Sequence, residues 1–154
     1  RHDPNPFPPS DDPTFTLEQP DGSAVRLTVA DLRALPAVTV PNCYIVSTGH
    51  GTSGPFTFGG VLVRDLLAAY LPAEIPWSAV VVLSGDGFGT RLSAAEVQAE
   101  PVLLAHTVDG RPLTRREGLV RLIVPGETDD ALKQVKWVER VMVITESARD
   151  RAGP

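Results

Sequence analysis

The chain of 154 residues is long enough for one domain, since domains cluster around roughly 100 to 150 residues. Hydrophobic residues make up 42% and charged residues 21% of it, so the chain can bury an ordinary globular core. A net charge of -5, with Lys and Arg dispersed, argues against nucleic acid or an anionic membrane surface as a partner. No apolar run reaches the roughly 18 to 20 residues of a membrane span.

The N-terminal end differs in composition from the rest. Residues 1–13 contain five prolines and cannot bury enough apolar surface to offset the entropy of ordering, which predicts a flexible Pro-rich arm. The domain itself is expected over 14–147, followed by a tail over 148–154. A Pro-rich leader that begins at Arg1 is typical of a domain tethered after a cleaved signal or lipid anchor. We therefore expect export, periplasmic or extracellular, with a cytoplasmic location as the alternative.

The first elements are a hairpin and capped helices. Apolar and polar residues alternate over about 14–18 and 24–28, on either side of a Pro-Asp-Gly turn, which predicts two paired strands. Short helices are predicted over 29–35 and 93–100, each behind a capping box, and 61–71 has apolar residues at helical spacing. The capping pairs are Thr28 with Asp31 and Ser93 with Glu96.

Further strands are predicted in the middle of the chain. The β-branched run 38–48 indicates a strand that is interrupted at Pro41, hence an edge strand or one with a bulge. Residues 49–60 contain five glycines and predict a loop that leads into the next helix. Four later strand regions follow: 79–84 before a glycine turn, 102–113 with a turn at Asp109-Gly110, 119–126, and 135–147 with at least seven residues in the strand.

These elements favour an α+β fold. Helices stand between antiparallel-looking hairpins instead of alternating strictly with strands, and no internal repeat is present. A mixed sheet with short helices is the expected architecture.

The order of these elements resembles the oxidoreductase molybdopterin-binding domain of the sulfite oxidase family, from about Leu27 to Thr145. The resemblance implies that fold, a molybdenum pyranopterin (molybdopterin) cofactor, oxygen-atom transfer to or from a small substrate, and a redox protein as electron partner. The segments that carry it are LTVADLRALP, the strand with Cys43, FGGVLVRDLL, LSGDGF, VLLAHTVDGRPL, VRLIVPG and VKWVERV.

Cys43 is the residue that the resemblance assigns to the metal. In the family, a cysteine at the end of an early strand gives its thiolate to molybdenum, and Cys43 stands in the matching place. Thiolate ligation suits a redox metal. The alternative is that the single cysteine of the chain is a small buried hydrophobe.

The segment after Cys43 departs from the family pattern but offers anion-binding groups. Glycines let backbone N–H groups approach a phosphate, and an imidazole can donate a hydrogen bond. A surface loop with an exposed histidine is the alternative. The candidate cofactor-binding residues here are Ser47, Thr48, Gly49 and His50.

Phe88 occupies a position that the resemblance assigns to catalysis. The LSGDGF turn corresponds to a family turn that often reads Asp-Gly-Tyr, whose hydroxyl faces the substrate. Phenylalanine can pack there but cannot donate a hydrogen bond. That part of the chemistry is expected to be lost.

Cations near the C-terminus are candidates for the pterin phosphate. The resemblance places Lys133 and Lys136 there, with Arg140 following, and the alternative is a solvated edge strand. Period-two alternation predicts opposite sides for two sets of side chains. One set is Lys136, Val138 and Arg140, and the other is Val135, Trp137 and Glu139.

Two further motifs are assigned no function. His106 lies in a strand region, where an isolated histidine is more often structural than a ligand. Asp129 and Asp130 follow Pro125-Gly126 and fit a polar loop better than an acid-base pair or a divalent cation site.

Two functions stay open from the sequence. One is a molybdopterin-dependent oxidoreductase with a small-molecule cofactor or substrate, and the other is a cofactor-free binding module on the same scaffold, which holds another small ligand or a protein partner. A structural or adhesion role has no residue signal of its own.

Overall fold

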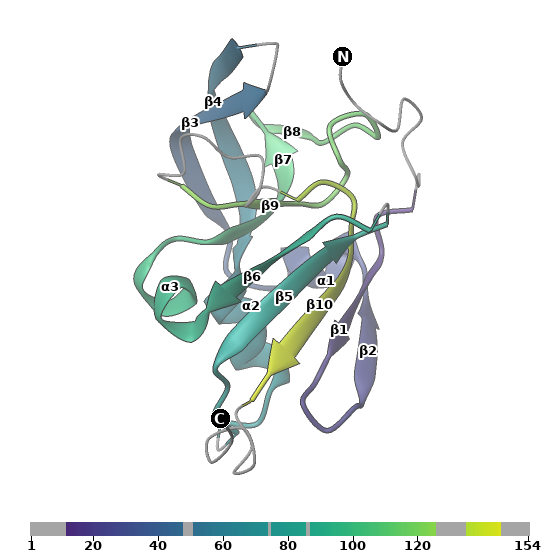
Figure 1. The fold of residues 1–154 in the computed structure, drawn as a ribbon. Coiled ribbons are helices and arrows are strands. Elements are labelled where there is room, and N and C mark those ends of the chain that lie inside the picture. Colours follow the sequence, from purple (N-terminus) through teal and green to yellow (C-terminus); the bar gives the residue numbers. More distant parts are fainter. Residues whose placement is uncertain (1–11, 48–50, 74, 86, 126–134, 146–154) are drawn as a thin grey trace.

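The computed structural model describes residues 12–47, 51–73, 75–85, 87–125 and 135–145. Within them the chain forms two sheets and three short helices, with sheet B above sheet A in Figure 1. No helix among these residues is long and apolar enough to cross a membrane.

Sheet A is mixed. Its strand order is β2-β1-β10-β5-β6, in which β1 and β10 run parallel and the other pairs are antiparallel. The hairpin predicted near the N-terminus supplies β1 and β2, so that prediction is confirmed. The strands are β1 (Phe15–Glu18), β2 (Ala24–Leu27), β5 (Ala79–Ser84), β6 (Gly89–Ser93) and β10 (Val138–Ile144).

Sheet B is antiparallel and follows the order β3-β4-β7-β8, with β9 beside β8 on the far edge of β7. β3 is an edge strand, and its register shifts between Val40 and Cys43, so both predictions drawn from Pro41 are confirmed. The strands are β3 (Val38–Ser47), β4 (Gly51–Leu62), β7 (Leu103–Val108), β8 (Arg111–Pro112) and β9 (Arg121–Ile123).

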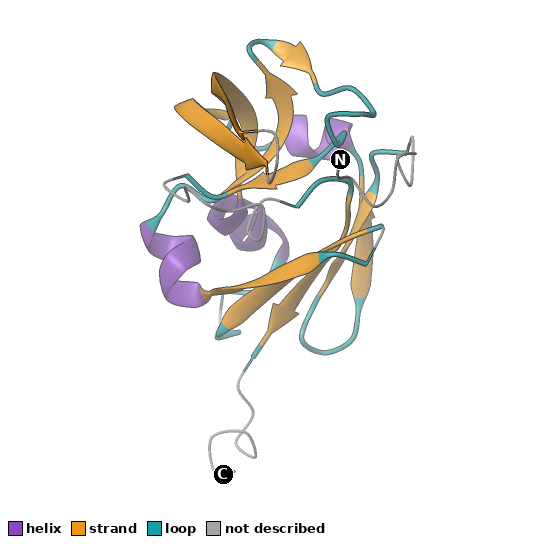
Figure 2. Ribbon diagram, turned by 45° about the horizontal axis from the view of Figure 1, so that its top comes forward, coloured by secondary structure: helices purple, strands orange, loops and turns teal. Residues whose placement is uncertain are grey.

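The three helices are α1 (Val29–Arg33), α2 (Val63–Tyr70) and α3 (Ala94–Ala99), and Figure 2 shows α1 and α2 in the region between the two sheets. Both predicted capping boxes are present at α1 and α3. Such caps satisfy the first backbone N–H groups of a helix, so these short helices need little propensity of their own.

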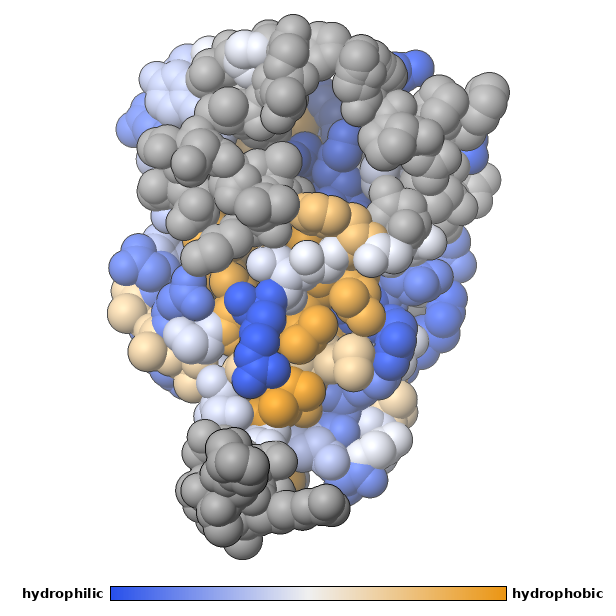
Figure 3. Space-filling view, viewed as in Figure 1, coloured by the Kyte–Doolittle hydropathy of each residue, from blue (hydrophilic) through white to orange (hydrophobic). Residues whose placement is uncertain are grey.

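The main core lies between the sheets. Inner side chains of sheet A pack against all three helices and one face of sheet B, with Phe15, Leu66 and Leu104 all 0% exposed. The opposite face of sheet A carries apolar side chains that are only half-buried, and Figure 3 shows them gathered over β5 and β10. These side chains are Val81, Leu83, Met142 and Ile144.

A second cluster covers the other face of sheet B and contains the one cysteine of the chain. Its members come from every strand of that sheet or the turns beside them, so the fold brings together residues far apart in sequence. They are Val40, Cys43, Phe58, Leu62, Leu103, Ala105, Val108, Leu113 and Ile123.

Two predictions about elements were wrong, and one strand was missed. Residues 51–62 form the longest strand, β4, where a glycine-rich loop was expected, and α2 therefore begins at Val63. β6 was not foreseen. Gly60 explains the first error, because a Cβ there would lie 2.0 Å from the backbone oxygen of Leu104. The glycine permits a close approach of β4 and β7 instead of a loop.

Candidate functional site

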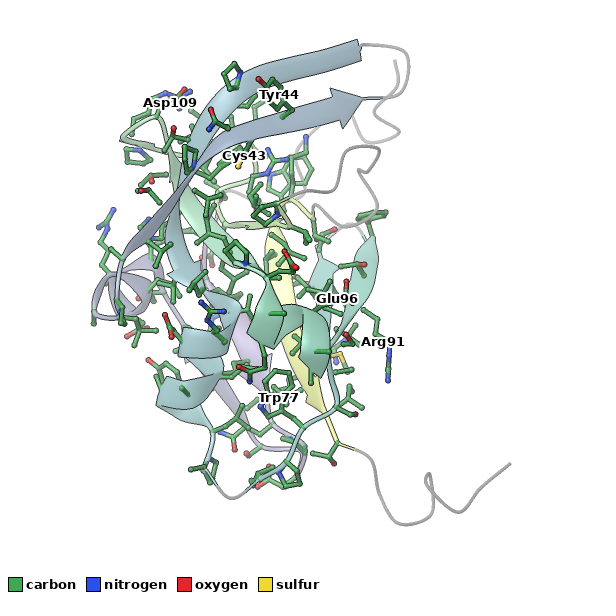
Figure 4. The ribbon with its side chains drawn as sticks, turned by 90° about the vertical axis from the view of Figure 1, so that its left-hand side faces the viewer. Cys43, Tyr44, Trp77, Arg91, Glu96 and Asp109 are labelled. Atoms are coloured by element: carbon green, nitrogen blue, oxygen red, sulfur yellow. The ribbon has the colours of Figure 1, made fainter. Side chains whose placement is uncertain are left out.

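Cys43 sits in β3 opposite Phe56 of β4, and the register of the pair shifts on both sides of it. Asn42 before it has a φ of 59°, a left-handed conformation that fits such an irregularity. The result is a cysteine that is 8% exposed and faces the second core cluster. Figure 4 shows it below the β3–β4 ribbon, toward the body of the domain.

The thiol of Cys43 is held by backbone groups. Its Sγ donates a hydrogen bond to the carbonyl oxygen of Val40 at 3.4 Å, and the backbone N–H of Phe58 donates to the sulfur. Burial raises the pKa of the thiol, and the Phe58 N–H opposes that shift. Cys43 is therefore a protonated thiol at neutral pH in this state of the protein.

Phe58 also contacts a cation. The guanidinium carbon of Arg121 lies 5.5 Å from the centroid of the Phe58 ring. Arg121 is opposite Ala105 in the β9–β7 register, and directly paired side chains lie on the same face of a sheet. Ala105 belongs to the cluster of Cys43, so the arginine and the cysteine share one face of sheet B.

Arg121 is a buried cation that has no acidic partner within the described part of the chain. It is 7% exposed and forms no ion pair with any described acid. Its Nη1 donates to the backbone oxygen of Glu117 at 3.2 Å, while its Nε finds no hydrogen-bond partner among the described residues. Burial lowers the pKa of Arg121 to about 10, against the opposing charge of Glu117. The guanidinium is thus charged at neutral pH.

The carboxylate of Glu117 is engaged elsewhere. Arg111 donates to both of its oxygens, Nη1 to Oε1 and Nη2 to Oε2, each at 2.7 Å. The backbone N–H of Thr114 adds a bond of 2.9 Å to Oε1. These contacts, with that of Arg111 the strongest, lower the pKa of Glu117 to about 2.

Arg121 was not among the residues predicted for the site, although its sequence context marks it as a candidate. It is the one charged residue in the run VRLIV, and arginine is almost never fully buried unless it is paired. A charge inside an apolar strand is therefore a candidate for ligand contact. Whether an internal acid neutralises it depends on the tertiary fold.

The glycine-rich candidates lie at the far end of the β3–β4 ribbon. Ser47 is the last residue of β3 and pairs with Gly51, while 48–50, which include Thr48, Gly49 and His50, lie outside the described residues. Ser47 stands four residues beyond Cys43, roughly 13 Å along a strand.

The predicted alternation around Lys136 was wrong. Val138 is buried together with Val135 and Trp137. Trp137 has a φ of 52°, and the register shifts after Val138, so regular alternation does not extend back to Val135. Strand β10 begins at Val138. Lys136 is half-buried, with its Nζ 4.8 Å from the centroid of the Trp137 ring. Arg140 binds Glu18, with 3.0 Å between Nη2 and Oε1. Lys133 lies outside the described residues.

Phe88 lies in the turn between β5 and β6 of sheet A. Its backbone oxygen accepts a hydrogen bond from the Ser84 N–H at 2.7 Å, which closes the β5–β6 turn of sheet A. Its side chain is 37% exposed. The ring of Phe88 is thus partly exposed, and it carries no hydroxyl.

Among the remaining candidates, only His106 lies in the described part of the chain. Burial lowers the pKa of His106, and its Nδ1 has no hydrogen-bond partner in the described part of the chain. Asp129 and Asp130 lie outside that part. Within it, no three His, Cys, Asp or Glu side chains gather in a way that could hold a metal ion.

A pocket of about 220 Å³ lined by described residues lies at the junction of the two sheets. None of the residues predicted for the site lines it. Its walls come from the segment before β1, from Arg26 of β2, and from the segments around Gly85, Gly118 and Trp137.

The chain was compared with known protein families and solved structures. The family model of the oxidoreductase molybdopterin binding domain matches residues 4–151. The chain belongs to this family. The molybdopterin-binding domain is similar in fold to the sulfane dehydrogenase SoxCD from Paracoccus pantotrophus, with a TM-score of 0.70 and 21% identity over 90% of this chain. It spans 39% of the length of that chain. No curated protein matches significantly.

Proposed function

We propose that this molybdopterin-binding oxidoreductase domain holds the pterin phosphate of its cofactor at Arg121. The supporting observation is a buried guanidinium whose Nε has no hydrogen-bond partner among the described residues and which forms no ion pair with a described acid. An unpaired buried charge costs several kcal/mol, roughly 3 to 5 when a partner is removed, so its retention favours an external anion. Arginine is also the side chain best suited to bind phosphate oxygens in a fork.

The neighbourhood of Arg121 fits a planar, anionic ligand. Phe58 places an aromatic face beside the guanidinium, and Cys43 receives the N–H of the same Phe58. A ligand phosphate at Arg121 would replace the missing acid in a site from which water is largely excluded, where charge-assisted bonds are strong.

Cys43 is the proposed metal ligand within this function. When bound, the molybdenum pyranopterin supplies oxygen-atom transfer and electron exchange, and the protein supplies orientation and charge. A metal takes a thiolate and so overcomes a raised thiol pKa on binding. Loading would thus release the proton that Cys43 now donates to Val40.

The remaining cofactor contacts are proposed from the family resemblance alone. Ser47, Thr48, Gly49 and His50 would serve as further donors, and Lys133 and Lys136 as further cations. Phe88 would form an apolar wall, because it has no proton to donate. The substrate is proposed to be small, and electrons would pass to a redox protein.

The experiment measures cofactor content directly. Wild type, Arg121→Gln and the control Arg91→Gln are expressed in a molybdenum-replete host, and the pterin fluorescence and molybdenum of each pure protein are measured. Arg91 is a matched control, because it is exposed on β6 and points away from the molecule (Figure 4).

Arg121→Gln should carry roughly tenfold less pterin, equivalent to about 1.4 kcal/mol, while Arg91→Gln matches wild type. Pterin bound equally by all three would overturn the proposed role of Arg121. Cys43→Ser separates the metal from the pterin. It should lose molybdenum and keep pterin, and equal molybdenum in both proteins would remove Cys43 from the site.

A second candidate function rests on the state of Cys43. A protonated thiol that bonds to a backbone oxygen inside an apolar cluster also suits a cofactor-free module, in which Arg121 holds a different anion. Wild type purified without pterin or molybdenum, but stabilised by inorganic phosphate in an Arg121-dependent manner, would favour this reading.

A further inference from the structure

Arg121 has an acid as its direct neighbour, yet no ion pair forms. The backbone oxygen of Glu117 accepts a bond from Arg121, and the charge of Glu117 acts on the guanidinium. A flexible Glu side chain at this place is a ready partner for a buried arginine. Such a pair would occupy the cation that the proposed function gives to the ligand.

Arg111 prevents this pairing in the structure. It takes both carboxylate oxygens of Glu117 at 2.7 Å, in the bidentate geometry that fixes direction as well as distance. Thr114 strengthens the same orientation through its backbone N–H and its hydroxyl, which accepts the N–H of Glu117 at 3.2 Å. The carboxylate is thereby directed to the protein surface.

A tight turn between β7 and β8 positions Arg111 near Glu117. Asp109 and Gly110 have φ values of 51° and 86°, which suits a two-residue hairpin turn between β7 and β8. The Asp109 N–H and carboxylate bond to the backbone of Thr57 on β4 and anchor the turn. Arg111 therefore projects from a fixed hairpin toward the segment that precedes β9.

Stability alone gives little reason for this ion pair. The side chain of Arg111 is 53% exposed, and ion pairs exposed to solvent contribute little to stability. The pair instead has a consequence for its buried neighbour, because the acid it captures is the one whose charge acts on Arg121.

We propose that Arg111 is a positioning residue that holds Glu117 away from Arg121 and so keeps the buried guanidinium open for an anionic ligand. This inference rests on the proposed function of Arg121. Loss of Arg111 frees the carboxylate of Glu117 to turn inward and compete with the ligand. Loss of Glu117 as well removes the competitor.

The test is a double-mutant cycle of wild type, Arg111→Gln, Glu117→Gln and the double variant. Two readouts are used: pterin carried by the purified protein, and the affinity of cofactor-free protein for inorganic phosphate by calorimetry. Arg111→Gln should weaken both roughly tenfold, about 1.4 kcal/mol. The double variant should recover to at least the wild-type level, and Glu117→Gln should bind at or above it.

A purely structural ion pair predicts a different pattern. Arg111→Gln, Glu117→Gln and the double variant would then be equally impaired, and this result would overturn the inference. Arg111→Lys serves where Arg111→Gln does not fold, since it keeps one charge-assisted bond and should fall between wild type and Arg111→Gln. Equal binding by Arg111→Lys and wild type would also count against it.

The failure of the inference can be told apart from failure of the proposed function. If Arg121→Gln binds phosphate and pterin like wild type, Arg121 is not the anion site. If Arg121→Gln loses binding while the Arg111 and Glu117 effects are simply additive, the site stands and only the positioning role falls.

Discussion

The guanidinium of Arg121 stacks on the ring of Phe58 at 5.5 Å, and the backbone N–H of that same Phe58 bonds to the sulfur of Cys43. One residue of β4 thus connects a buried cation from β9 with the thiol from β3. The consecutive strands β3 and β4 and the distant strand β9 contribute to a single face of sheet B, and this convergence underlies the proposed cofactor site.

The buried charge of Arg121 should destabilise the cofactor-free protein. Arg121→Met keeps the apolar stem and removes a cation without an acidic partner, so we expect the free energy of unfolding of the cofactor-free domain to rise by about 1 to 4 kcal/mol. Urea denaturation of both cofactor-free proteins measures this. A loss of several kcal/mol would mean that Arg121 is a structural residue already satisfied by its contacts.

The pair of Arg111 and Glu117 should give the protein a specific acid sensitivity. The pKa of Glu117 is lowered from 4.5 to about 2, so the pair stabilises the fold above pH 4.5 and this contribution is lost as the pH falls toward 2. Because the pair is largely exposed, the expected contribution is only about 1 kcal/mol.

Thermal unfolding across that pH window checks this contribution. The difference in Tm between wild type and Glu117→Gln should shrink as the pH is lowered. Two curves that stay parallel would show that the ion pair adds no pH-dependent stability.

Gly60 should be far less tolerant of a methyl group than its neighbour Gly59. A Cβ at Gly60 meets the backbone oxygen of Leu104 at 2.0 Å, whereas one at Gly59 meets the end of the Thr107 side chain at 2.4 Å, which can rotate. Gly60→Ala should therefore cost about 3 kcal/mol or more and Gly59→Ala less. Urea denaturation of both variants ranks them, and equal costs would contradict the close approach of β4 and β7.

Local signals in the sequence predicted local structure well. The capping boxes at Thr28 and Ser93, the hairpin of β1 and β2 and the turn at Asp109 all depend on residues a few positions apart. Pro41 likewise indicated an edge strand with an irregular register, and β3 has both properties. The family resemblance, built on the order of such elements, was confirmed.

Features that depend on residues distant in the chain could not be predicted from the sequence. The glycines of β4 suggest a loop in the sequence alone. In the fold, β7 lies so close that a Cβ at Gly60 would be 2.0 Å from the backbone oxygen of Leu104. Arg121 looks like an ordinary strand residue until the fold buries it and Arg111 takes its nearby acid. The domain limits, export, and the roles of Ser47 and Lys136 stay predictions.

An experimental structure of the protein with its pterin cofactor would show whether Arg121 holds the phosphate. We expect a phosphate oxygen within about 3 Å of the Arg121 Nε, with the Glu117 carboxylate still bound to Arg111. A bound cofactor whose phosphate lies elsewhere, with Arg121 unchanged, would contradict it.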